Sequence, residues 1–141
     1  IVFEGEFKDG KVVAGTGGTL IREEIMEYRG QVNEDFIPHG LGIATYKKAW
    51  TMYQYKGEFY KGVKNGIGSF LYRDDSTFEG EVKDDLRNGV GKLVKGKTVF
   101  KGEFKANERS GMGFCVEKRG KEDVIVVRGL YTSGKISKAF L

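Results

Sequence analysis

The sequence holds very little cysteine, histidine or proline. Cys115, His39 and one proline are the only examples among 141 residues. A single cysteine excludes an internal disulfide, and a single histidine leaves too few soft ligands for a zinc site. We therefore expect no metal, no cofactor and an intracellular, cytoplasmic setting.

Long apolar runs and a leader segment are missing as well. No apolar stretch approaches the roughly 20 residues that a membrane-spanning helix needs. The opening residues, IVFEGEFKDG, contain neither an initiating Met nor the basic and apolar regions of a signal peptide. We expect one domain that does not cross a bilayer and that is a fragment or a processed product.

Glycine, in contrast, is abundant and recurs at fixed places. It accounts for 22 residues, about twice its usual share. Six segments share a central glycine, and successive central glycines are 25, 27, 23, 22 and 27 residues apart. In the first five copies a Gly-x-Gly begins nine or ten residues later. The six segments are Phe3–Phe7, Tyr28–Val32, Tyr55–Phe59, Phe78–Val82, Phe100–Phe104 and Val127–Tyr131.

The pattern around each central glycine predicts a β-hairpin. Tyr55, Gly57 and Phe59 alternate with Lys56 and Glu58, which is the period of a strand. Five residues after each central glycine stands a residue type that tolerates positive φ. These turn positions are Gly10, Asp35, Gly62, Asp85, Asn107 and Gly134. The second strand begins at the Gly-x-Gly, and no helix of ordinary length is needed.

The glycines themselves have a predicted purpose in this sheet. A ring such as that of Tyr55 can lie over a neighbouring Cα only where no Cβ intrudes, as at Gly57 or Gly68. A phosphate-binding loop is excluded because no helix follows these glycines.

The segments YKGEFYKGVKNGIG and FEGEVKDDLRNGVG resemble the MORN repeat (membrane occupation and recognition nexus). The resemblance covers Phe3 to Gly134, with Gln31 and Val32 departing from the usual Glu and aromatic residue. It implies an all-β, single-layer twisted antiparallel sheet of stacked hairpins, a meander with a concave groove. We expect one domain of six repeats with degenerate terminal copies, at about 1–25, 26–52, 53–75, 76–97, 98–124 and 125–141.

Catalysis is not expected from this sequence. Cys115 and His39 lie three repeats apart, and contacts in a linear stack run between neighbours, so the two should not meet. The recurring Glu58, Glu81 and Glu103 are interpreted first as hairpin residues that bond or pair across strands. The alternative is a ladder of carboxylates that meets basic or amide groups of a partner.

The central repeats are the expected binding site. The resemblance places the leading aromatics Tyr55, Phe78 and Phe100 near a partner, with Glu58, Glu81 and Glu103 as polar members. The partner would be a protein helix or an extended peptide, and self-association is a further option. Trp50 falls outside the repeat pattern and is either a loop-packing residue or an exposed anchor.

Charge is distributed unevenly along the chain. Residues 1–46, 47–94 and 95–141 carry net charges of −4, +2 and +6. The basic cluster near the C-terminus would attract anionic membrane lipids, although a solvated face is the first interpretation. No recognition helix accompanies it, so nucleic acid is not an expected partner. The cluster comprises Lys95, Lys97, Lys101, Lys105, Lys118, Arg119, Lys121 and Arg128.

The resemblance to the MORN repeat implies a non-catalytic scaffold for protein–protein interaction, acting at a membrane or the cytoskeleton. Two alternatives stay open. One is a targeting module of a larger enzyme, such as a lipid kinase or a protein methyltransferase. The other is a phosphoinositide-binding peripheral membrane domain.

Overall fold

The computed structural model describes the whole chain except residues 1, 9–10, 13–16, 23–25, 48–50 and 141. Strands are the regular elements of the described residues. They are β1 (Val2–Gly5), β2 (Phe7–Lys8), β3 (Lys11–Val12), β4 (Gly17–Arg22), β5 (Met26–Val32), β6 (Pro38–Tyr46), β7 (Met52–Tyr60), β8 (Val63–Tyr72), β9 (Thr77–Lys83), β10 (Leu86–Lys95), β11 (Thr98–Lys105), β12 (Glu108–Arg119), β13 (Glu122–Thr132) and β14 (Lys135–Ala139).

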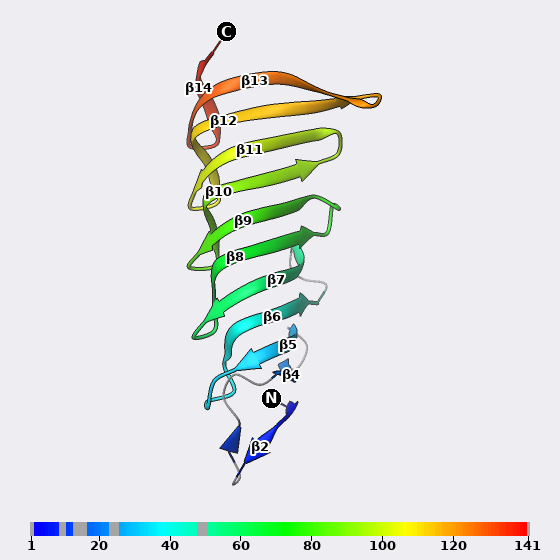
Figure 1. Cartoon of the computed structure of the whole chain (residues 1–141), viewed down its shortest axis with the longest axis vertical. Helices are drawn as coiled ribbons and strands as arrows, with labels where there is room; N and C mark the ends of the chain where they lie inside the picture. The colour runs from blue at the N-terminus through cyan, green and yellow to red at the C-terminus, as the bar shows by residue number, and fades with distance from the viewer. Residues whose placement is uncertain (1, 9–10, 13–16, 23–25, 48–50, 141) are drawn as a thin grey trace.

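Twelve of these strands form one open antiparallel sheet in chain order. The order is β1-β4-β5-β6-β7-β8-β9-β10-β11-β12-β13-β14, so each strand from β4 to β13 pairs with both of its neighbours in this order. Figure 1 shows the strands stacked from the N-terminal end at the bottom to the C-terminal end at the top. The predicted all-β meander of hairpins is confirmed. The first copy departs from it, because β2 and β3 pair with each other in a separate two-stranded sheet.

A row of glycines crosses the sheet at right angles to the strands. Each member is directly opposite the next on the neighbouring strand. In the first copy the row passes through Gly18. The row comprises Gly5, Gly18, Gly30, Gly42, Gly57, Gly68, Gly80, Gly91, Gly102, Gly113 and Gly129.

Aromatic rings lie against this glycine row, as the sequence predicts. A Cβ at Gly68 would come 2.6 Å from Cζ of Tyr55, and a Cβ at Gly57 would come 2.8 Å from its hydroxyl oxygen. The ring of Phe100 would meet a Cβ at Gly113 at 2.5 Å in the same way. Side chains at Gly68 and Gly113 would collide with these rings, and a side chain at Gly57 would also collide with the backbone of the facing strand.

The predicted turn positions are confirmed in four copies. Gly62, Asp85, Asn107 and Gly134 all have positive φ, and so does the residue before each of them. Two successive residues of positive φ match the right-handed twist of the flanking strands. In the second copy the residue of positive φ is Phe36, with φ of 60°, and not Asp35. That loop is longer because the Asn33 carboxamide oxygen accepts the N–H groups of Asp35 and Ile37. Gly10 lies outside the described residues.

The core lies on one face of the sheet, here called the inner face. It consists of rings in edge-to-face contact, such as Tyr55 with Phe59 at 5.0 Å and Phe100 with Phe104 at 5.3 Å between centroids. Tyr28 also contacts Phe59 of the next repeat, so the core runs through neighbouring copies. The opposite face is called the outer face.

The six repeat boundaries given in the sequence analysis stay a prediction.

Candidate functional site

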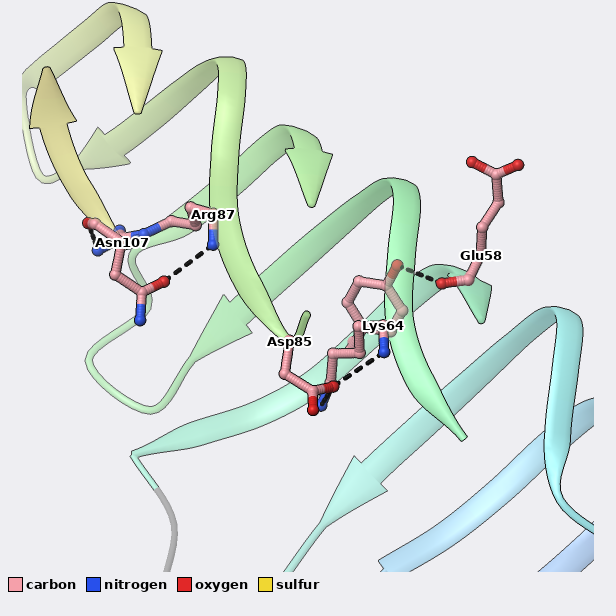
Figure 2. A network of polar contacts seen from close by, with 6 residues as sticks. Glu58, Lys64, Asp85, Arg87 and Asn107 are labelled. Carbon is pink, nitrogen blue, oxygen red and sulfur yellow. Dashed lines mark hydrogen bonds and ion pairs between the residues drawn. The ribbon is translucent and has the colours of Figure 1, made fainter. Parts of the chain in front are cut away.

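Each repeat is joined to the preceding one by its turn. The Asp85 N–H donates to the Lys64 carbonyl oxygen at 3.0 Å, while the Asp85 carboxylate accepts the Lys64 N–H at 2.8 Å. Asn107 and Arg87 exchange the equivalent pair of hydrogen bonds one repeat later. Figure 2 shows these contacts side by side, with the Glu58 side chain pointing away from them. The turns therefore hold the repeats in a fixed register.

The recurring glutamates fill a gap in the strand pairing on the outer face. In β9 and β10, Gly80 pairs with Gly91 and Val82 with Arg87, so Glu81 opposes three residues. Its carboxylate accepts the Val90 N–H at 2.5 Å, and Glu103 accepts the Met112 N–H at 2.6 Å. Bonding across strands was the first interpretation of these residues, and the geometry agrees with it.

The other two central copies repeat this bond. The Glu58 carboxylate accepts the Ile67 N–H, and the Gln31 carboxamide oxygen accepts the Leu41 N–H at 2.8 Å. Gln31, which departs from the repeat pattern, therefore accepts the same hydrogen bond that the glutamate accepts in the other copies. The first glycine of the Gly-x-Gly lies in the same bulge: Gly66 has φ of 115° and packs against the Glu58 carboxylate.

The middle residues of the Gly-x-Gly segments form an exposed apolar row on the outer face. Leu41, Ile67, Val90 and Met112 are 62, 60, 62 and 54% exposed. They alternate across the sheet with the glutamates, because Leu41 is opposite Glu58, Ile67 opposite Glu81 and Val90 opposite Glu103. We call this set the outer row. Sequence reasoning missed its apolar members, although their spacing between two glycines was a usable signal.

A second row runs parallel to the outer row on the other side of the glycines. Its side chains are mixed: basic residues such as Lys56, Lys92 and Lys101 alternate with uncharged ones and with Glu79. Between the two rows lies an open groove of about 630 Å³, lined by residues such as Leu41, Ile67 and Lys56. One side of the groove is thus apolar, with Leu41 and Ile67, and the other side carries both basic and acidic groups, including Arg29, Lys56 and Glu79.

The predicted aromatic anchors lie elsewhere. Tyr55 and Phe78 are 0% exposed and Phe100 is 1% exposed, all on the inner face. A ring that exposes no surface cannot contact a partner directly, so we reassign these three aromatics to the core. The aromatics and the glutamates are on opposite faces of the sheet and do not form one site.

Cations cover the buried rings on the inner face. Lys64 Nζ is 5.0 Å from the centroid of the Tyr46 ring, and the Arg109 guanidinium is 4.8 Å from that of Phe100. Arg87 lies between them in the repeat order, 5.4 Å from the Phe104 ring. We call these three residues the stacked cations. Each stands two residues before a Gly-x-Gly, a recurrence that sequence reasoning could have used.

Burial also perturbs the tyrosine hydroxyls. Removal from water raises the pKa of Tyr28 and of Tyr131 to about 12, because the phenolate form loses hydration. The pKa of Tyr55 is raised by the same cause, and the nearby Glu58 charge adds to the effect. The Tyr55 hydroxyl donates to the Glu58 carbonyl oxygen at 2.8 Å.

The predicted basic face is divided among three places. Lys95 and Lys97 lie at the β10–β11 turn, next to Lys118, Arg119 and Lys121 at the β12–β13 turn. Two of these five cations lie near acidic groups, Lys95 near Asp74 at 3.9 Å and Arg119 near Glu117 at 3.4 Å. Lys101 and Arg128 flank Phe114 in mid-sheet, and Lys105 lies at the other hairpin end. The eight residues therefore do not form one face.

The single cysteine and histidine are far apart. His39 lies on β6, where Nδ1 accepts the Lys61 N–H at 3.1 Å, and the Cys115 thiol lies on β12, 3.4 Å from the Tyr131 hydroxyl. Six strand spacings separate them, about 29 Å. In the part of the chain that the structure describes, no cluster of three His, Cys, Asp or Glu suits a metal ion. None of the described residues forms a helix able to span a membrane. Trp50 lies outside the described residues.

The family model of the MORN repeat matches residues 3–15, 55–77, 78–97 and 100–116, together just over half of the chain. The chain belongs to the MORN-repeat family. The matched segments correspond to the first, third, fourth and fifth copies of the hairpin. A comparison with curated proteins finds no match.

Membership of the MORN-repeat family supports a coarse statement of function. MORN repeats are generally interaction modules for proteins and membranes, and they are generally non-catalytic. The outer row and its groove are the exposed surface on which such an interaction can be built from the residues of this chain.

Proposed function

We propose that the chain is a protein-interaction scaffold that binds an amphipathic segment of a partner in the groove of the outer face. The observation that carries the proposal is the outer row, in which four large apolar side chains stay exposed at the same position of successive repeats. A surface that a monomer leaves apolar and regularly spaced marks a contact site more often than a scattered apolar residue does.

The spacing of the row limits the shape of the partner. Its apolar members lie on every second strand, about 9.6 Å apart. Residues seven apart on an α-helix are about 10.5 Å apart, and residues three apart on an extended chain about 10 Å. Both a helix and an extended segment, laid across the strands, fit this spacing.

Charge limits the composition of the partner. Each glutamate of the outer row keeps an exposed carboxylate between two apolar neighbours, while the opposite side of the groove carries Arg29 and Lys56 together with Glu79. A segment with apolar residues at the spacing above, basic residues facing the glutamates and acidic residues facing Lys56 would be complementary. Such complementarity mainly sets orientation and association rate.

Three finer proposals rest on the family resemblance alone. They are that the chain acts at a membrane or the cytoskeleton, that it self-associates, and that it is a targeting module of a larger enzyme. These finer proposals do not change the surface that we assign. They would determine which cellular fraction supplies the partner.

The test is affinity capture with the intact chain and with a folded double variant, Ile67→Asp and Val90→Asp. Two new carboxylates in the apolar positions should abolish capture of the partner. Ile125→Asp is the matched control, because Ile125 is 59% exposed but lies outside the outer row. Charge reversal at Lys118 and Arg119 is the competing variant. If the double variant keeps the partner while this charge reversal releases it, the outer row is the wrong site.

A further inference from the structure

A second surface feature lies on the inner face, independent of the outer row. It is a cleft of about 500 Å³ beside the stacked cations. Four basic residues line it, Arg73, Arg87, Lys95 and Arg109, with Asp74 as the acidic member, so its net charge is about +3. We call it the cationic cleft. Its volume falls in the range of pockets that hold small molecules.

The two central arginines are held in place before any ligand arrives. The Arg87 guanidinium lies against the rings of Phe104 and Phe78, at 5.4 and 5.8 Å from their centroids. That of Arg109 lies 4.8 Å from the Phe100 ring centroid. Stacking of this kind fixes a planar guanidinium while leaving its N–H edge available, so little side-chain entropy remains to be lost on binding.

Most hydrogen-bonding capacity of these arginines is unused. A guanidinium carries five N–H donors. Arg87 Nη2 donates to the Asn107 carbonyl oxygen at 2.7 Å, and Arg87 Nε is buried out of reach of a ligand, so the remaining terminal N–H groups are the ones that a ligand can meet. No side chain or carbonyl among the described residues accepts a hydrogen bond from the Arg109 guanidinium.

The remaining lining groups suit an anion with a polar body. Lys95 has a side chain that is 77% exposed and is held near Asp74 by a long 3.9 Å ion pair, which an incoming anion can replace. Asp74 is itself bonded to the Ser76 hydroxyl and N–H, and these bonds lower its pKa. Tyr72 lies between the two sides of the cleft, close enough to both Arg87 and Asp74 for their charges to act on its hydroxyl.

We propose that the cationic cleft binds a small molecule that carries two or more phosphate or carboxylate groups. Arg87 and Arg109 occupy equivalent positions on β10 and β12, two strand spacings or about 10 Å apart. Each of the two positions presents its own guanidinium fork, so a ligand with linked anionic groups can engage both. Arginine forks bind phosphate and carboxylate oxygens through paired N–H bonds, and Lys95 supplies a further charge at the mouth.

The test is calorimetric titration of the intact chain with two soluble probes, tripolyphosphate and citrate, in about 0.15 M salt, where pairs between exposed charges are weakened. We expect saturable binding of one molecule per chain. Arg109→Gln should weaken it about tenfold or more, since it removes a charged hydrogen-bond donor. Lys95→Gln should weaken it about threefold, as suits a more exposed charge.

Lys101→Gln is the matched control, because it removes the same charge from the outer face and should change affinity less than about twofold. Arg109 also packs against the core, so its variant must be checked for folding by circular dichroism. Should Arg109→Gln fail to fold, the test is the comparison of probe affinity between Lys95→Gln and Lys101→Gln, because neither of these side chains supports the core. Absence of saturable binding of both probes below about 1 mM, a free energy of about −4 kcal/mol, would overturn the proposal. So would equal weakening by Lys95→Gln and Lys101→Gln.

A lipid headgroup and a soluble anion share this chemistry, and a third arm separates the two sources. Vesicles of phosphatidylcholine with phosphatidylinositol bisphosphate are tested for binding to the same variants. Vesicle binding that Lys95→Gln weakens identifies a headgroup as the source, and binding of the free probes alone identifies a soluble ligand. If Lys95→Gln leaves vesicle binding unchanged and the free probes do not bind, the cationic cleft is not the binding site.

Discussion

The ring of Tyr55 lies against the backbone of Gly68 on the neighbouring strand, so near that a Cβ at position 68 would come 2.6 Å from its Cζ. This pair belongs to one hairpin and is repeated by Phe78 with Gly91 and by Phe100 with Gly113. The aromatic core and the glycine row are therefore one feature, since each ring occupies the space that a side chain in the row would need.

A substitution in the glycine row should be costly. Gly68→Ala forces the Tyr55 ring or the backbone to move, and we expect a loss of about 2–4 kcal/mol in the free energy of unfolding, measured by urea titration. Gly17→Ala is the control, because a Cβ there meets nothing within 4 Å. Equal stability of the two variants would show that the ring does not require the glycine.

The turn of each repeat should stabilise the repeat before it. Asp85→Ala removes the acceptor of the Lys64 N–H and places alanine at a φ of 67°, so we expect a loss of about 2–3 kcal/mol. Asp85→Asn keeps both the acceptor and the tolerance of positive φ and should cost far less. Thermal melts of the two variants provide the measurement, and similar melting of both would contradict the role assigned to this contact.

Stability should fall at alkaline pH because of the buried tyrosines. The pKa of Tyr28 is about 12 in the folded chain and about 10 when exposed, so the unfolded chain loses this proton first as pH rises. The contribution of the Tyr28 hydroxyl to the free energy of unfolding is complete below pH 10. It is lost between about pH 10 and 12, at up to about 1.4 kcal/mol per pH unit.

The check is urea titration at several pH values with Tyr28→Phe. Phenylalanine fits this position, because Phe78 and Phe100 occupy it in later repeats. The variant should lose some stability at neutral pH with the hydroxyl bond to Gln31, but its stability should fall less steeply above pH 10. An unchanged alkaline slope would mean that Tyr28 is not the titrating group.

The repeating features of the fold could be predicted from the sequence because each is decided within one hairpin. The alternation around Gly57, the turn at Gly62 and the ring of Tyr55 over Gly68 involve only residues 55–68, whose spacing is visible in the chain. The turn of the second copy could not be placed in the same way, since Asn33 closes a longer loop there and moves the positive φ to Phe36.

The site was harder to predict because its geometry depends on neighbouring strands. Alternation places Glu81 and Phe78 on opposite faces of a strand, but the three residues that Glu81 opposes, and hence its bond to Val90, follow from the pairing of β9 with β10. Burial of Phe78 likewise follows from contacts between repeats, because its ring packs against Phe70 of the preceding copy and Phe104 of the next. The sequence pattern of an aromatic row is the same whether the rings are exposed or covered. In the folded chain, the cations that lie over the rings help to bury them.

The bonds between each turn and the preceding repeat also govern how the molecule responds to force. Strands neighbour one another in chain order, so tension on the two ends loads one strand pair at a time and peels it open. Each detached repeat of 22 to 27 residues would release roughly 75–90 Å of extended chain. If the two ends of this sheet are attached to other structures, the chain should therefore extend in small steps, with one hairpin unfolding after another before the whole sheet is unfolded.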